Sequence, residues 1–183
     1  LHLKSPILTL EEMAALKHLK SSHADWPSVT IDITFDKGEG LPGYRNALNR
    51  VRQEALNAVQ AGFKVIILSD RATSPSRVPI SAILATGGVH HYLVQQKKRA
   101  DVAILVETGE AREVHHMCVL VGYGADAVCP WLIMEMIHKV DKEGLAKDGQ
   151  TVEALIGNYK KATDEGILKV LSKMGVSTLA SYK

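Results

Sequence analysis

The sequence predicts an α/β fold in which alternating strands and helices build a parallel sheet. Two observations support this prediction. Short apolar runs alternate along the chain with segments whose apolar residues recur every three or four positions. The connections between them are short, which favours parallel strands joined by right-handed crossover helices. Only four or five strands are visible in the 183 residues, so we expect a partial, barrel-like sheet around one core.

The strands are predicted from apolar and β-branched runs. Residues 29–35 alternate apolar with polar side chains, which is typical of a strand. Residues 63–68 and 102–106 are nearly continuous apolar runs, as expected for parallel strands covered on both faces. A shorter strand is expected over residues 125–129, and residues 176–179 are a candidate for a further strand.

The helices are predicted from apolar residues at spacings of three and four. Thr9 and Glu12 have the spacing of a capping box, which indicates a short first helix. The remaining predicted helices run from Tyr44 to Gly62, from Pro79 to the basic run at 97–99, from Val114 to Gly122 or Gly124, and from Pro130 to Val140. The basic run is expected to be the solvated end of its helix.

The last third of the chain is predicted to be mainly helical. Residues 141–150 are polar and contain two glycines, so they indicate a linker. Thr151 is positioned to cap a following helical region, Gly166 is expected to break it, and Gly175 is expected to end it.

Composition excludes several classes of partner. The net charge is +2, and aromatic residues make up 5% of the chain, so neither nucleic acid nor an anionic membrane is expected to bind. No apolar run approaches the roughly 20 residues of a membrane span. Cys118 and Cys129 have apolar neighbours and indicate reduced core thiols, too few for an iron–sulfur cluster.

Polar residues gather where three predicted strands end. Functional sites of parallel α/β folds form at the carboxyl ends of strands, so we expect these loops to lie side by side on one rim. The candidate residues of this rim are Asp70, Arg71, Glu107, Thr108, Glu110, Arg112, Glu113, His115, His116 and Asp126.

Three interpretations are open for the rim. Carboxylates and histidines serve acid–base catalysis or bind metals. The spacing disfavours a metal, because there is no HExxH motif and adjacent residues such as His115 and His116 point about 100° apart on a helix. Arginines beside carboxylates favour an ionic network that fixes loops or a domain interface, and this is the preferred interpretation.

The glycines of Gly122-Tyr123-Gly124 are similar to those of phosphate-binding segments. No basic residue follows them, and Pro130 lacks a backbone donor. Helix C-caps explain these glycines more simply. The chain contains neither a GxxxxGK[ST] motif nor a GxGxxG motif after a strand, so a nucleotide-binding fold is not supported.

Four segments resemble the central domain of glutamate synthase, and the resemblance runs in order from about Ile31 to the last residue. These segments are Leu68-Ser69-Asp70-Arg71, residues 106–116, residues 121–128 and residues 166–182. Four long matches in sequence are more specific than any single motif in the chain.

The resemblance implies a parent enzyme that converts L-glutamine, 2-oxoglutarate and a reductant into two molecules of L-glutamate, in glutamate biosynthesis and ammonia assimilation. In that family an amidotransferase domain releases ammonia. A barrel with FMN and an iron–sulfur cluster then reduces 2-iminoglutarate with electrons from NAD(P)H or ferredoxin. The central domain is a flavin-free relative of that FMN TIM barrel, joins the two catalytic domains and helps to form the ammonia path.

The resemblance carries over no catalytic, cofactor-binding or metal-binding residue. We therefore expect a segment without its own cofactor, inactive alone, whose partners are the amidotransferase and FMN domains of the same chain. The expected organisation is a helical lead-in over 1–27, an α/β core over 28–150, and a helical segment over 151–183 that leads into the FMN domain. Both ends are expected to be cuts in a longer polypeptide.

The expected compartment is the cytoplasm, with an organelle left open. Unpaired sheet edges would favour self-association of the piece. Two functional alternatives also stay open. One is a free-standing small α/β enzyme that uses the rim from Glu107 to His116 for acid–base chemistry, and the other is an interaction module without enzymatic activity.

Overall fold

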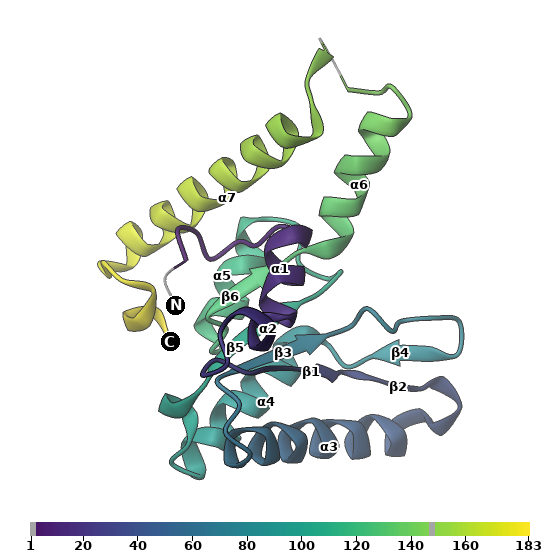
Figure 1. The fold of residues 1–183 in the computed structure, drawn as a ribbon, viewed down its shortest axis with the longest axis vertical. Coiled ribbons are helices and arrows are strands. Elements are labelled where there is room, and N and C mark those ends of the chain that lie inside the picture. The colour runs from purple at the N-terminus through teal and green to yellow at the C-terminus, as the bar shows by residue number, and fades with distance from the viewer. Residues whose placement is uncertain (1–2, 147–148) are drawn as a thin grey trace.

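The structure is a computed structural model that describes residues 3–146 and 149–183. Its centre is a four-stranded parallel sheet in the order β1-β3-β5-β6 (Figure 1). The strands are β1 (Ser28–Asp32), β3 (Val65–Ser69), β5 (Ala103–Glu107) and β6 (Ala127–Cys129). The predicted α/β class and the parallel order are confirmed, and the described residues form an open sheet rather than a closed barrel.

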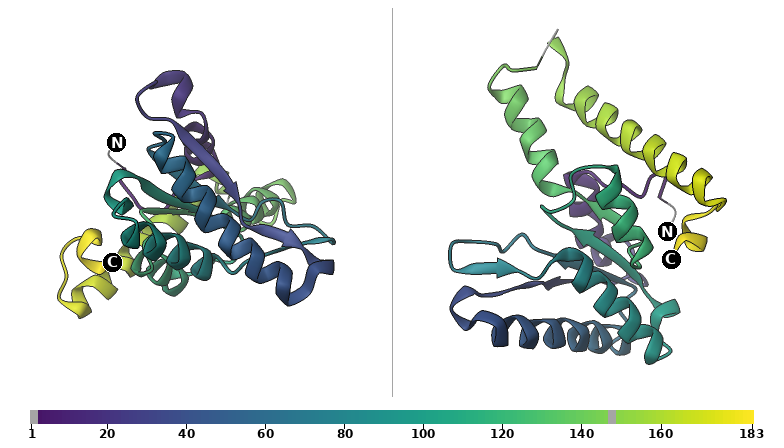
Figure 2. Two further views of the ribbon diagram at one scale, coloured as in Figure 1. Left: turned by 90° about the horizontal axis from the view of Figure 1, so that it is seen from below. Right: turned by 180° about the vertical axis from the view of Figure 1, so that it is seen from behind.

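The outer face of the sheet is covered by the crossover helices α3 (Gly40–Gln60), α4 (Ala82–Gln95) and α5 (Val114–Gly122). Seen from behind, α4 and α5 lie in front of the strands (Figure 2). Buried residues of these helices pack against Ile66, Leu68 and Val106 of the sheet. Burying such side chains stabilises the fold by roughly 1.5–3 kcal/mol each, so this layer dominates the core.

The inner face is covered by α1 (Leu10–Lys17), which lies in front of the sheet and is followed by the short α2 (Leu19–Ser22) (Figure 1). Met13 and Leu16 of α1 pack against Val65, Ile67 and Leu105. The helix begins with the predicted capping box. The Thr9 amide donates to the Glu12 carboxylate, and the Glu12 amide donates to the Thr9 hydroxyl. The N-terminal segment also extends the sheet beside β6 through a parallel bridge at Ile7.

A two-stranded antiparallel ribbon, formed by β2 (Thr34–Asp36) and β4 (Arg77–Pro79), extends from the sheet and was not predicted. The predicted strand at 29–35 is therefore interrupted between β1 and β2. Pro79 ends β4 instead of opening a helix, and α4 begins three residues later. The guanidinium of Arg77 fixes the ribbon by donating to the Asp32 carboxylate at 2.7 Å and to the Thr34 hydroxyl at 2.9 Å. Such long-range polar contacts leave no periodic signal in the sequence.

The helix predicted to begin at Tyr44 begins four residues earlier. Residues 36–43 contain the 3-10 helix η1 (Lys37–Glu39) and the first turn of α3, which begins at Gly40. A second 3-10 helix, η2 (Arg99–Asp101), precedes β5.

After β6 the chain forms two helices that project from the body, α6 (Trp131–Lys142) and α7 (Val152–Met174) (Figure 1). Thr151 caps α7, and Gly175 ends it in a left-handed conformation with φ of 71°, as predicted. The predicted break at Gly166 is wrong, because the glycine allows α7 to pass close to Val114 of α5 without interrupting the helix. The last predicted strand is also wrong, since Thr178 caps the 3-10 helix η4 (Leu179–Tyr182).

The two glycines inside α7 provide a matched test of this packing. A Cβ at Gly157 would meet nothing within 4 Å, whereas a Cβ at Gly166 would meet the methyl groups of Val114. We expect Gly157→Ala to raise the free energy of unfolding of residues 1–183 by about 0.5–1 kcal/mol, because alanine favours helix. Gly166→Ala should lower it despite the same gain in propensity. Urea denaturation measures both, and equal stabilisation by the two variants would contradict the close approach.

Candidate functional site

The carboxyl ends of β3, β5 and β6 place Ser69, Glu107 and Cys129 in one row, because the register pairs Ser69 with Glu107 and Glu107 with Cys129. The row lies on the inner face, under α1. Lys17 of α1 donates to the two oxygens of the Glu107 carboxylate at 2.8 and 2.7 Å. The Ser69 hydroxyl donates to the same carboxylate at 2.5 Å. The Glu107 side chain is 4% exposed, and its charge is balanced by the ammonium of Lys17.

The Asp70 carboxylate ties together the loops that follow β3, β5 and β6. It accepts hydrogen bonds from the Thr108 hydroxyl at 2.6 Å and from the Gly109 amide at 3.0 Å. It also accepts from the indole Nε1–H of Trp131. The guanidinium of Arg71 lies 4.7 Å from the centre of the Trp131 ring and forms an ion pair with Glu135 of α6. Asp70 is thus held by uncharged donors, and Arg71 pairs with Glu135 instead of Asp70, so hydrogen bonds and one ion pair fix these loops. The expected role of the rim at a domain interface stays a prediction.

Thr108 and Glu110 hold the start of α4 in place. The Thr108 hydroxyl accepts from the amide of Glu110 at 3.0 Å. The Glu110 carboxylate accepts from the amide of Ala82 at 2.8 Å and from the Ser81 hydroxyl at 3.2 Å. A carboxylate at the first amides of a helix also interacts favourably with the helix dipole. Glu110 therefore acts as a cap supplied by a different loop.

The second half of the predicted rim has separate partners. Nδ1 of His116 accepts from the amide of Arg112 at 3.2 Å, and Nε2 of His116 lies 3.6 Å from Glu113. The Tyr159 hydroxyl of α7 donates to the carbonyl of Arg112 at 3.1 Å. His115 is exposed and lines, with His116 and Glu110, a hollow of about 280 Å³ between α4 and α5. Among the described residues, no hydrogen bond or ion pair joins these histidines to Glu107.

Asp126 does not lie on the rim, and its expected position there is wrong. The residue precedes β6, so it sits at the amino end of the sheet. Its carboxylate accepts from the Ile104 amide at 2.8 Å and from Arg99 at 3.0 Å, and it also pairs with Lys183. Arg99 is 17% exposed and donates to the Val102 carbonyl as well, so the basic run at 97–99 is not simply a solvated helix end.

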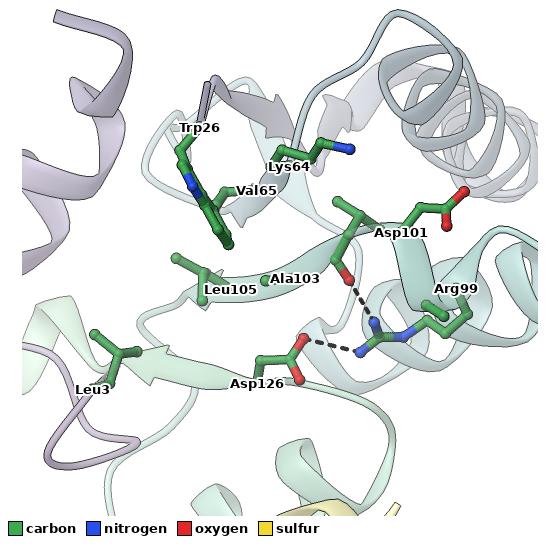
Figure 3. A pocket seen from close by; sticks show the side chains of 11 residues that line it. Leu3, Trp26, Lys64, Val65, Arg99, Asp101, Ala103, Leu105 and Asp126 are labelled. Carbon is green, nitrogen blue, oxygen red and sulfur yellow. Dashed lines mark hydrogen bonds and ion pairs between the residues drawn. The ribbon is translucent and has the colours of Figure 1, made fainter. Parts of the chain in front are cut away.

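A cavity of about 530 Å³ lies near this second cluster, at the amino end of the inner face. Figure 3 shows the side chains that line it. Leu3 and Trp26 flank it, and Leu105 forms part of its floor. The charged side chains of Arg99 and Asp126 point toward each other across its border, and Arg99 also bonds to backbone carbonyls. Their polar atoms are thus already used within the chain.

The two cysteines are unreactive core thiols in this arrangement. Both are buried, and burial raises the pKa of Cys118. Burial, with the nearby charge of Glu107, raises the pKa of Cys129 to about 12, so neither side chain is an available thiolate near neutral pH. Within residues 3–146 and 149–183, no group of three or more His, Cys, Asp and Glu side chains is arranged to hold a metal ion.

Sequence reasoning missed the residues that complete the rim network. These residues are Lys17, from the helix α1 that precedes the sheet in sequence, and Trp131 and Glu135, from the helix α6 that follows it. Trp131 lies two residues after the end of β6, so its position beside the loops could have been predicted. Lys17 gave no such signal, because its role depends on α1 crossing the inner face.

Comparison with known proteins assigns this arrangement to a family. The family model described as "Glutamate synthase central domain" matches residues 1–183. The chain belongs to this family. The resemblance stated from the sequence is therefore confirmed.

Curated relatives of this central domain are much longer proteins. The chain is 54% identical over 183 residues to glutamate synthase [NADH] of Schizosaccharomyces pombe, covering all of this chain and 9% of the relative. It is 40% identical to the glutamate synthase [NADPH] large chain of Azospirillum brasilense, covering 12% of that protein. It is 34% identical to the ferredoxin-dependent glutamate synthase of Cyanidium caldarium, again over 12% of its length. The chain thus spans about a tenth of these relatives.

Solved structures share the fold of the central domain. A flavocytochrome b2 variant with benzoylformate superposes with a TM-score of 0.63 at 13% identity, over 93% of this chain and 36% of the other. A mandelate oxidase variant with (S)-mandelic acid gives a TM-score of 0.59 at 13% identity, over 92% and 41%. The expected relation to the FMN TIM-barrel fold is confirmed, with four parallel strands in place of a closed barrel. No helix in the described ranges has the length and apolar character needed to cross a membrane.

The Lys17–Glu107 pair should be a major contributor to the stability of the central domain. Lys17→Met leaves the Glu107 carboxylate buried without its cation, so we expect the free energy of unfolding to fall by about 2–4 kcal/mol. The double variant Lys17→Met/Glu107→Gln should recover part of that loss, since the uncompensated charge is gone. Denaturant titration of residues 1–183 measures these values. Lys139→Met, at a side chain that is 71% exposed, is the control and should change stability by no more than about 0.5 kcal/mol.

The Asp126 cluster should make stability depend on pH. Burial alone would raise the pKa of Asp126, but the hydrogen bond from Lys183 and the charge of Arg99 outweigh it and hold the pKa below its usual range. The stabilisation is therefore present above about pH 4 and is lost as the pH falls through the folded-state pKa.

Asp126→Asn is accordingly expected to destabilise residues 1–183 by about 1–3 kcal/mol at pH 7, with a difference from wild type that shrinks below about pH 4. Thermal unfolding at several pH values tests this, with the exposed Asp25→Asn as control. A constant difference down to pH 2 would argue against the charged cluster.

Proposed function

We propose that this chain serves as the central domain of a glutamate synthase that makes L-glutamate from L-glutamine, 2-oxoglutarate and a reductant. In this proposal the domain joins the amidotransferase and FMN domains, helps to form the ammonia path and contributes no catalytic residue. The observation that carries the proposal is the internal use of the rim. Glu107 is held by Lys17 and Ser69, and Asp70 is held by three donors of the chain itself.

Chemistry at a barrel mouth needs side chains that face a substrate. General bases act within hydrogen-bond reach of the proton that they remove. Glu107 instead faces α1, which packs on the inner face of the sheet and contacts Glu107 through Lys17. Asp70 is 3% exposed, and its oxygens meet a hydroxyl, an amide and an indole. This arrangement supports a structural role for Glu107 and Asp70 rather than a catalytic one.

The parent enzyme would supply the cofactors. We propose FMN and an iron–sulfur cluster on other domains, with NAD(P)H or ferredoxin as electron donor. The names of the relatives include NADH, NADPH and ferredoxin, which supports this range of donors. We further propose a cytoplasmic location and a tendency of the isolated segment to self-associate. Among the described strands, β1 pairs only with β3, which supports such an open edge.

Activity of the full-length enzyme tests whether the rim does chemistry. We expect the double variant Lys17→Met/Glu107→Gln and the variant His116→Ala to retain glutamine-dependent glutamate synthesis within about tenfold per folded molecule. A general acid–base residue would instead lose about 10²- to 10⁴-fold on removal. Folding is checked by flavin content and by the melting temperature of the same preparations. A loss of that size in a folded, flavin-loaded variant would overturn the proposal.

A further inference from the structure

The two projecting helices enclose an apolar groove. Ile133, Met136, Ile137 and Val140 of α6 face Leu155 and Tyr159 of α7, and the space between them is about 390 Å³. The α6 residues lie at positions i, i+3, i+4 and i+7, so they form one stripe along the helix. A stripe of this kind normally packs against another element of structure.

This stripe is only partly covered by the chain itself. Met136 is 52% exposed and Val140 is 36% exposed, and Leu145, just after the helix, is 65% exposed. Among the described residues of α6, Met134 alone is fully buried. Four of the eleven exposed large apolar side chains in the described ranges lie between residues 132 and 145. Contiguous apolar surface of this kind marks an interaction site more often than scattered single residues do.

Both walls of the groove are fixed at their bases, so its shape is preformed. The first turn of α6 is tied to the sheet by the Trp131–Asp70 hydrogen bond and the Glu135–Arg71 ion pair. The middle of α7 is tied to α1 by Lys160, whose ammonium lies 2.8 Å from the Glu12 carboxylate. Figure 1 shows α6 and α7 inclined toward each other as they extend away from the body. A preformed groove reduces the entropy lost when a partner binds.

We propose that this groove receives the apolar face of an amphipathic helix from another domain of the same glutamate synthase polypeptide. The inference rests on the proposed function as the central domain. Its relatives carry roughly nine-tenths of their length outside the matched region, so the remaining domains offer abundant covalently attached partners. Covalent attachment gives such a segment a high effective concentration, which favours it over a partner free in solution. Two neighbouring helices with an apolar groove between them are a common receptor for a third helix.

The test uses the full-length enzyme with a photoactivatable benzoyl-phenylalanine replacing Met136. Ultraviolet light should link this position to a peptide from outside residues 1–183 of the same chain, identified by mass spectrometry after proteolysis. The matched control replaces Lys139, one residue before Val140 on the solvent side of the same helix, and should give at least tenfold less of that product. Bound flavin and the melting temperature show that both variants are folded.

Hydrogen exchange of the full-length enzyme gives an independent measurement. In wild type, the amides of 133–142 should exchange at least tenfold more slowly than in Met136→Asp, while Lys139→Asp should match wild type. The amides of α4, which is remote from the groove, should be unchanged in all three and serve as the folding check.

Three outcomes would overturn the proposal. One is a cross-link between two chains, which would identify a second copy as the occupant. Another is the absence of any cross-link from position 136 outside residues 1–183, together with equal exchange in all variants. The third is a cross-link to a separate protein. None of these outcomes would alter the activity of the Lys17→Met/Glu107→Gln enzyme, so a failure here is distinguishable from a failure of the proposed function.

Discussion

The buried carboxylate of Glu107 is the constraint on which the rest of the structure depends. A carboxylate that is 4% exposed at the end of a central strand is strongly destabilising unless a cation and hydrogen-bond donors meet it. Ser69 from the neighbouring strand supplies a donor, and Lys17 supplies the charge. Because Lys17 is at the end of α1, this requirement fixes α1 across the inner face of the sheet. The same helix then buries the apolar residues that a closed barrel would bury against its remaining strands.

Each end of the sheet contains a largely buried carboxylate that binds donors from several elements. At the carboxyl end, Asp70 gathers donors from the loops that follow β5 and β6. At the amino end, Asp126 gathers Arg99, Lys183 and a strand amide. Each cluster holds segments that are distant in sequence: Asp70 joins the loops that follow β5 and β6, and Asp126 joins Lys183 to the sheet. The open sheet thus has polar fastenings at both ends and α1 over its inner face.

The fold was largely predictable from the sequence, whereas the site was predictable only in part. Continuous apolar runs indicated the parallel strands, and Thr9, Thr151 and Gly175 marked helix ends by local chemistry. Gly166 misled the prediction, because a glycine in a helix can mark a break or a close contact, and only the position of α5 decides between them. The rim was recognisable because strand ends converge. Its partner Lys17 was not, since no local pattern encodes a contact 90 residues away.

Solved structures at 13% identity share the fold of this domain. Apolar side chains on both faces of the sheet are sufficient to form the parallel strands, but they do not determine which residues lie at the strand ends or what function those residues have. In this domain α1 packs on the inner face, and the carboxylates of Glu107 and Asp70 accept hydrogen bonds from donors of the chain itself. Helix α1 covers part of the inner face, and several of the apolar side chains that stay exposed lie on α6 and α7. The docking proposal therefore rests on the position of that exposed surface on α6, whereas the carboxylates at the strand ends are already bound by donors of the chain itself.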